Sequence, residues 1–198
     1  MRKILFAAVL AVLASASNFA QNPNTWRIDT NHSSAQFGVR HMGISKVQGQ
    51  FTKVAGSVEF DEKDISKSSV NATIDVASVD TRVESRDNDL RSANFFDVAK
   101  YPTMTFQSKK VIQTGSGILQ VVGDLTLHGV TREVTLNVDG PSSAIKDPGG
   151  NLRRGFEATT KIVRQDFGLT YDKALGTGEL VVGNDISITL DIEIVKKP

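Results

Sequence analysis

Cysteine is absent from the 198-residue chain, which excludes disulfides, catalytic thiols and thiolate metal sites. Histidine is scarce as well, because His32, His41 and His128 are the only three. No two of them stand at a short metal-ligand spacing such as His-x-His. We therefore expect no metal centre, and we expect sheet and core to stabilise the fold instead of disulfides.

Neither sign of charge dominates, because 23 Lys and Arg stand against 22 Asp and Glu. Removing residues 1–20 takes away two of the basic residues and leaves 21 against 22, a formal charge of −1. No general attraction to the phosphates of a nucleic acid follows from this balance. A Gly-rich phosphate loop and a Gly-x-Ser-x-Gly elbow are also missing from the sequence.

The first twenty residues have the order of a secretory signal peptide. Two basic residues precede an apolar stretch, residues 4–14, and small residues follow. The stretch is too short to span a bilayer, and no cysteine is available for a lipid anchor. We expect cleavage near Ala20, with Ala16 as the alternative, and therefore a leader of residues 1–20 before a mature domain of residues 21–198. A buried N-terminal helix is the competing interpretation.

Apolar and polar residues alternate along most of the mature chain, as they do on a strand with one buried face. The clearest case runs from Gly117 to Val138 and is interrupted only at His128-Gly129, where we expect a hairpin turn. The period recurs in about eight segments at hairpin-like spacing. This pattern predicts an all-β fold, an eight-stranded antiparallel barrel that either fills with side chains or holds one small ligand.

The second of these strands has an irregularity. Phe51 lies on one parity of the alternation, whereas Val58 and Phe60 lie on the other. A slip of one residue would reconcile the two halves, so we expect a β-bulge or bend near Lys53–Gly56. The predicted strands are 35–39, 47–60, 70–76, one beginning at 104–108, 117–127, 130–138, 156–162 and 186–194.

One segment breaks the strand period. From 81 to 97 the spacing of apolar residues fits a helix better than a strand, with Ser85 as the expected N-cap. A single helix between two strands of a barrel most naturally covers an open end. We therefore expect residues 85–98 to form a lid, with Phe95 and Phe96 closing the mouth of the barrel.

Motif residues follow one another in a specific order through the whole mature chain. They are Trp26 with Asp29, His32-Ser33, Phe37, His41, Gly49, Phe51, Arg86-Asp87 with Leu90, Phe95-Phe96-Asp97, Tyr101-Pro102, Phe106, Gly123-Asp124-Leu125-Thr126, Gly129-Val130-Thr131, and Arg164 with Asp166-Phe167-Gly168. In order and spacing the chain resembles the YceI-like family of periplasmic proteins. The resemblance implies a lipocalin-like barrel with a helical lid, often dimeric, that binds long isoprenoid or similar lipid chains such as quinone tails. Asp89 stands where the family commonly has a histidine. We therefore do not expect in this chain the polar contact that the histidine would make at the mouth of the barrel.

The inward face of the predicted barrel combines large and small apolar residues, which either fit a taper or leave a tunnel. The candidate ligand-binding residues are Ala35, Phe37, Phe51, Phe60, Ala72, Ile74, Phe95, Phe96, Phe106, Leu125, Leu136, Phe156, Ala158, Phe167, Ile188 and Leu190. An alkyl or prenyl chain gains about 0.8 kcal/mol for each buried methylene, so burial alone could hold it. A barrel packed solid by its own side chains is the alternative.

Two charged clusters could indicate acid–base chemistry. Arg86, Asp87 and Asp89 lie at the start of the lid, and Arg164 lies near Asp166. We interpret both clusters as salt-bridged anchors of loops, because exposed charges usually solvate or pin loops. We therefore predict no catalytic residue and no cofactor, apart from a bound polyisoprenoid or quinone-like lipid.

These observations together predict a periplasmic binding or carrier protein for a polyprenyl chain, a quinone tail or a fatty-acid derivative. We expect no nucleic acid partner and no stable membrane span, and the resemblance is compatible with a homodimer. Two other functions stay open. An enzyme acting on such a lipid would need polar groups inside the barrel beyond His41 and Ser108, and a ligand-free interaction module would have a packed interior.

Overall fold

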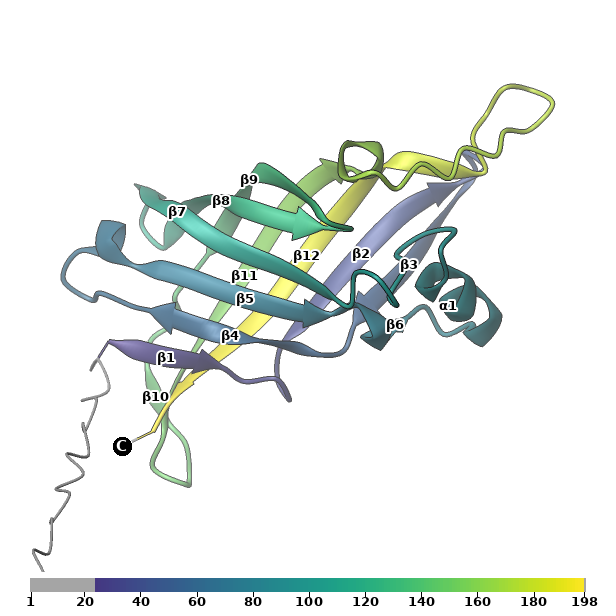
Figure 1. The fold of residues 1–198 in the computed structure, drawn as a ribbon. Helices are drawn as coiled ribbons and strands as arrows, with labels where there is room; N and C mark the ends of the chain where they lie inside the picture. Colours follow the sequence, from purple (N-terminus) through teal and green to yellow (C-terminus); the bar gives the residue numbers. More distant parts are fainter. Residues whose placement is uncertain (1–23, 198) are drawn as a thin grey trace, which may run out of the picture.

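A computed structural model describes residues 24–197, and most of them lie in strands or in the turns between strands (Figure 1). The strands are β1 (Thr25–Ile28), β2 (Ser34–His41), β3 (Ser45–Phe51), β4 (Val54–Glu59), β5 (Ser69–Asp75), β6 (Val79–Asp80), β7 (Thr103–Gly115), β8 (Ile118–Leu127), β9 (Val130–Asp139), β10 (Ile145–Lys146), β11 (Leu152–Val163) and β12 (Val182–Lys196). The helical segments are α1 (Glu84–Arg91) and the short 3-10 turns η1 (Ile65–Lys67), η2 (Val76–Ser78) and η3 (Arg164–Phe167).

Eight of the strands close into an antiparallel barrel, because β12 pairs with β1 on one side and with β11 on the other. The order around the barrel is β11, β9, β8, β7, β5, β4, β1 and β12. Figure 1 shows these strands curving around one shared interior. The prediction of an eight-stranded antiparallel barrel is confirmed.

Three barrel strands are interrupted and continue as a second segment. β1 is followed by β2 along the same edge of β12, β3 precedes β4, and β5 passes through η2 into β6. The break between β3 and β4 falls at Thr52 and Lys53, and both Phe51 and Val54 are buried on its two sides. Residues that face the same side of a regular strand lie two positions apart, whereas the buried residues Phe51 and Val54 lie three positions apart. This spacing requires an irregularity in the strand, and it lies at the N-terminal end of the predicted Lys53–Gly56 segment.

The hairpin between β8 and β9 turns where the alternation predicted it. His128 and Gly129 both have a positive φ, at 52° and 75°, and Leu127 pairs with Val130 across them. Two central residues in the left-handed region are the signature of a type I′ turn, whose twist matches that of the flanking strands. This turn fixes the register of β8 against β9.

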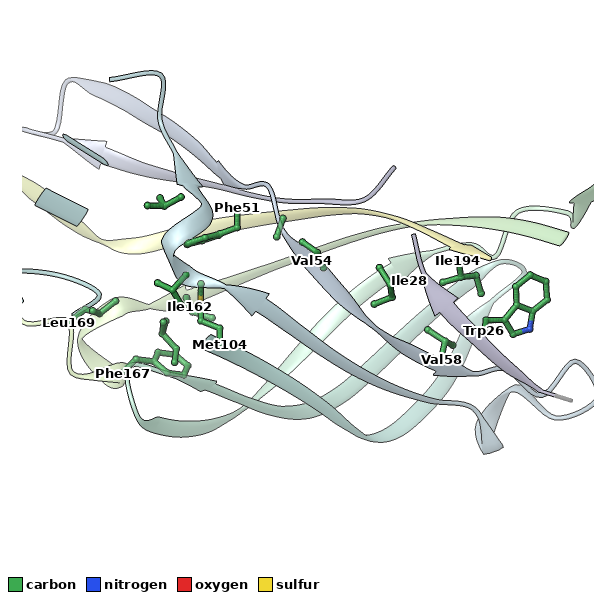
Figure 2. Packing of buried hydrophobic residues seen from close by; sticks show 14 of the residues in the cluster. Trp26, Ile28, Phe51, Val54, Val58, Met104, Ile162, Phe167, Leu169 and Ile194 are labelled. Atoms are coloured by element: carbon green, nitrogen blue, oxygen red, sulfur yellow. The ribbon is translucent and has the colours of Figure 1, made fainter. Parts of the chain in front are cut away.

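Buried apolar residues extend through the barrel from end to end. Figure 2 shows Trp26, Val58 and Ile194 at one end of the cluster and Phe167 and Leu169 at the other. All five are at most 7% exposed, and Ile194 is completely buried. The core is therefore continuous along the barrel axis, from the Trp26 end to the end that η3 covers.

Helix α1 is shorter than the predicted segment and begins differently. Its N-cap is Val83, whose side chain makes no capping hydrogen bond, so the prediction of Ser85 as N-cap is wrong. The reason is the buried carboxylate of Asp87, which accepts hydrogen bonds from the backbone N–H of Thr81, at 2.9 Å, and from its hydroxyl. The first turn of the helix is thus anchored to Thr81, the residue that follows β6. Figure 1 shows α1 beside β3 and β6, at one end of the barrel.

The predicted leader, residues 1–20, lies outside the described residues. Within residues 24–197, no helix has both the length and the apolar character that a membrane span requires.

Candidate functional site

An apolar cavity of about 260 Å³ lies inside the barrel. Residues from all eight barrel strands contribute to its wall, together with residues from the lid segment after α1. This volume is just below the range of roughly 300–1,000 Å³ that is usual for small-molecule sites. At about 30 Å³ for each water-sized group, it accommodates roughly nine such groups, which corresponds to a short stretch of hydrocarbon chain.

The structure brings all but one of the candidate ligand-binding residues together on this wall. The lining residues among them are Ala35, Phe37, Phe51, Phe60, Ala72, Ile74, Phe95, Phe96, Phe106, Leu125, Leu136, Phe156, Ala158, Ile188 and Leu190. Strand alternation found those on the strands because inward-facing positions recur at every second residue, whereas Phe95 and Phe96 came from the predicted lid. Their role in holding a ligand stays a prediction.

Phe167 is the exception. It is 2% exposed and belongs to the core cluster, but it does not line the cavity. It lies in η3, where the chain leaves the strand and alternation no longer predicts which residues face inward. Arg164 and Leu169 contribute to the wall from this region instead.

Two glycines make room for aromatic rings on the cavity wall. A Cβ atom at Gly123 would lie 2.6 Å from the Phe106 ring, and one at Gly49 would lie 2.5 Å from the Phe37 ring. Each ring therefore lies over the backbone of a neighbouring strand, at a distance that a larger residue would prevent. These glycines allow the two rings to approach the backbone of the neighbouring strand closely.

The lid segment covers one end of the cavity. Phe96 packs edge-on against Phe51 of β3, with ring centroids 5.6 Å apart, and Phe95 stacks on Tyr171 at 4.7 Å. Tyr171 lies in the loop between η3 and β12, so Phe95 joins the lid to the loop that faces it. Leu90 of α1 also lines the cavity. A ligand that enters from this end has to separate the two segments.

Aromatic rings fill the other end of the barrel. Trp26 and Phe60 meet edge-on with centroids 6.5 Å apart, and Phe60 meets Phe156 at 6.3 Å. The guanidinium of Arg154 lies over both Trp26 and Phe60, at 5.8 and 5.2 Å, and also forms an ion pair with Glu62 at 2.6 Å. This end is therefore sealed by rings and a cation, which leaves the lid end as the entrance.

The charged residues at the lid do not form the predicted salt bridges. Within residues 24–197, no ion pair of 4 Å or less joins Arg86 to Asp87 or Asp89. Arg86 instead donates to the hydroxyl and the carbonyl of Thr81, at 2.8 and 2.9 Å, and Asp87 accepts from the same residue. Asp89 accepts from the amide of Asn94 at 2.8 Å. The start of the lid is thus anchored by hydrogen bonds to Thr81 and not by the predicted salt bridges. Both the Arg86 guanidinium and the Asp87 carboxylate bind Thr81.

Arg164 also differs from the prediction, because it forms no pair with Asp166. Its side chain is buried, with the whole residue 3% exposed, and Asp166 is exposed. Burial lowers the pKa of the Arg164 guanidinium from its ordinary value, and the charge of Asp172 opposes this effect. The guanidinium donates to four backbone carbonyls, those of Leu169, Tyr171, Val182 and Gly183.

Polar residues are few on the cavity wall. They are Gln36, Ser68, Thr160 and Arg164, and neither His41 nor Ser108 contributes. The Ser108 hydroxyl accepts a hydrogen bond from the backbone N–H of Val70 at 2.8 Å. Among the described residues, the wall therefore includes no carboxylate and no imidazole. The sequence pattern missed Arg164 because its position follows the end of a strand.

A second polar cluster lies away from the cavity. Ligand atoms of Asp29, His32 and Glu193 all lie within 4.8 Å of one another, as in some metal sites. However, Arg153 donates to Asp29 at 2.5 Å and also to Glu193, and to Asp147 at 2.7 Å. Hydrogen bonds from Arg153 and then His32 lower the pKa of Asp29 to about 2. Arg153 thus supplies the positive charge that these carboxylates share, and we interpret the cluster as an ion-pair network.

Known proteins share both the sequence and the architecture. The family model of the YceI-like domain matches residues 26–194. A UPF0312 protein from Vibrio cholerae is 41% identical over 171 residues, which cover 85% of this chain and 89% of that protein. The YCEI protein of Campylobacter jejuni, in its crystal structure, is 30% identical with a TM-score of 0.68, over 80% of this chain and 90% of that one.

A more distant solved structure has the same fold. It is described as a polyisoprenoid binding domain from Saccharophagus degradans implicated in plant cell wall breakdown. The identity is 17% and the TM-score is 0.65, over 87% of this chain and 98% of that one. The family model and the relatives at 41% identity together show that the chain belongs to the YceI-like family.

Proposed function

We propose that this protein is a periplasmic carrier that holds the chain of an isoprenoid or similar lipid inside its barrel. The observation that carries the proposal is the apolar cavity, sealed by rings at the Trp26 end and covered by the lid at the other. A cavity of this kind offers burial to a hydrocarbon chain and few polar groups for chemistry. The polyisoprenoid-binding description of the Saccharophagus degradans domain, which has the same fold, supports the same ligand class.

The size of the cavity indicates how strongly a chain would bind. Roughly nine buried methylenes, at about 0.8 kcal/mol each, contribute about 7 kcal/mol. Association costs about 4–15 kcal/mol in lost translational and rotational freedom. A chain that only fills the cavity would therefore bind weakly. Tight binding requires a longer chain that displaces the lid, or an additional polar contact.

Export through the leader of residues 1–20 is the second part of the proposal. Cell fractionation followed by N-terminal sequencing tests it directly. We expect the protein in the periplasmic fraction with its N-terminus at Gln21, or at Ser17 if cleavage follows Ala16. Protein found in the cytoplasm with Met1 retained would contradict this part and leave the lipid-binding part standing.

Organic extraction of the protein purified from its native host, followed by mass spectrometry, tests lipid binding. We expect an apolar lipid in near-stoichiometric amount, absent from an unrelated periplasmic protein purified in parallel. Decanol and geraniol then serve as neutral ten-carbon probes for protein stripped of lipid, because their chains match the cavity. The absence of any extracted lipid, together with no binding of either probe, would overturn the proposed function.

A further inference from the structure

The cavity runs from the lid to a wall of aromatic rings at the other end of the barrel. Phe95 and Phe96 line it at the lid end, and Phe60 and Phe156 line it at the opposite end. Trp26 does not line the cavity but packs against Phe60, edge-on at 6.5 Å, and Figure 2 shows it at that end of the core. The Phe60 and Phe156 rings, 6.3 Å apart, are therefore the last groups that a chain entering past the lid would meet.

The sheet and its hydrogen bonds hold this end wall in place. The backbone N–H of Phe60 donates to the carbonyl of Asn24 at 2.9 Å, and Phe156 lies within β11, opposite Ile192 of β12. The guanidinium of Arg154 lies over the Phe60 ring at 5.2 Å, and Phe60 is only 5% exposed. The lid end, in contrast, is closed by side chains of two segments that lie outside the strands. Local opening is therefore expected at the lid and not at the end wall.

Only apolar atoms face the open space of the cavity. A lipid therefore gains from each methylene that it buries there, by about fourfold in affinity, and gains nothing from burying a polar group. An amphiphile should enter with its methyl end first and leave its polar end at the entrance. The gain should continue until the methyl end meets the end wall, which a space of about 260 Å³ allows for roughly nine methylenes.

We propose that the Phe60 and Phe156 rings are a stop that sets how many carbons of a lipid chain the barrel encloses. This inference rests on the proposed lipid-binding function and specifies its substrate class. The ligands are lipids with an apolar terminal segment of about ten carbons, whatever polar group stands at the other end. Carbons beyond this length lie at the lid and add little affinity.

Straight-chain alcohols from hexanol to tetradecanol, in steps of two carbons, test the inference on protein stripped of lipid. Each alcohol competes with a bound fluorescent fatty acid, and the competition gives its Kd. For the wild-type protein, we expect the Kd to fall more than about tenfold with each step up to decanol. Beyond decanol, each step should lower the Kd by less than about threefold. A steady fall up to tetradecanol, without this break, would overturn the inference and leave the proposed function intact.

Two variants move the end wall in opposite directions. Phe156→Ala removes a ring whose space holds roughly three methylenes, so the break should shift from decanol to dodecanol or tetradecanol. Ala158→Leu adds volume two residues from Phe156, on the same inward face of β11, so the break should shift to octanol. Phe167→Ala is the matched control, because it removes a buried ring that does not line the cavity, and its break should stay at decanol.

Three further results would contradict the stop. A break that stays at decanol in both Phe156→Ala and Ala158→Leu would place the limit elsewhere. An equal shift in Phe167→Ala and Phe156→Ala would mean that any loosening of the core lengthens the cavity. If Phe156→Ala fails to fold, Ala158→Leu decides alone, since a break at octanol supports the stop and a break at decanol overturns it. No binding of any alcohol would overturn the inference together with the proposed function.

Discussion

Phe95 stacks on Tyr171, with ring centroids 4.7 Å apart and ring planes at 26°, and this contact holds the lid segment to the loop before β12. The neighbouring Phe96 has a different contact, because its ring packs on Phe51 inside the barrel. One aromatic pair therefore joins two segments across the entrance, whereas the other belongs to the core. The two adjacent residues should respond differently to substitution.

Phe95→Ala should accelerate the release of a bound lipid by several-fold and lower the free energy of unfolding by only about 0.5–1.5 kcal/mol, the value of an aromatic pair. Phe96→Ala is the comparison variant, and it should lower stability more, by up to about 3 kcal/mol, because its ring packs against the core. Stopped-flow displacement of a bound fluorescent fatty acid and urea unfolding measure the two effects. An unchanged release rate in Phe95→Ala would show that the stack does not control the entrance.

Hydrogen exchange measures the opening of the lid in the unsubstituted protein. If the lid opens locally, amides of residues 84–98 should exchange faster than those of residues 186–194 in the lipid-free protein, and bound lipid should slow them. Equal protection of the two segments without lipid would mean that α1 is part of the core and opens only with the whole barrel.

Ala72→Phe should reduce the amount of lipid retained, because Ala72 lines the cavity and a phenylalanine ring would occupy it. We expect a loss of stability of about 1–3 kcal/mol from overpacking. Thr73→Phe is the matched control, since Thr73 is the next residue of β5 and is exposed. Mass spectrometry of extracted lipid compares the two variants, and equal lipid content in both folded proteins would argue against an occupied tunnel.

Asp87→Ala should destabilise the lid more than its position on a short helix suggests. The substitution leaves the backbone N–H of Thr81 without its buried acceptor, which typically costs about 1–3 kcal/mol. The exposed Asn88→Ala serves as control on the same helix. Hydrogen exchange of residues 84–91 should rise in Asp87→Ala alone, and identical exchange in both variants would mean that the Thr81 contact contributes nothing to the lid.

Stability should depend on pH through the Arg153 network. The folded protein holds the pKa of Asp29 at about 2, below its model-compound value of 3.8, so the unfolded chain binds this proton first. The contribution of Asp29 is therefore complete above about pH 4 and is lost as the pH falls toward 2. Asp29→Asn should lower stability at pH 6 and flatten this dependence between pH 4 and 2.5, as urea unfolding at several pH values would show. A wild-type profile flat over this range would contradict the prediction.

Much of the barrel follows from the period of two in the sequence. Leu125 and Leu136 line the cavity because neighbouring strands bring alternate residues to one face, and the His128-Gly129 turn sets their register. The break before Val54 was also visible, because the parity of buried residues changes there. These features depend on local geometry, so a single chain without relatives suffices to predict them.

Periodicity in the sequence did not predict the details of the segments outside the regular strands. The predicted strand ended at Ile162, so alternation was not extended into η3; Phe167 was a candidate that does not line the cavity, and Arg164, which does, was not a candidate. A capping prediction for Ser85 compared only residues close in sequence and did not anticipate that buried Asp87 would bind Thr81. The contact of Phe95 with Tyr171 joins distant segments, and nothing in the spacing of either ring indicates the other.

The pairing of β12 with β1, β2 and β11 has a consequence for the order of folding. Arg27 lies opposite Val195, so the contact that closes the barrel joins the first described strand to the last. Contacts between residues far apart in sequence form slowly, and this one cannot form at all until the final fifteen-residue strand has been synthesised. For a chain whose proposed route leads through a membrane channel, this late contact keeps the barrel open until β12 has been synthesised.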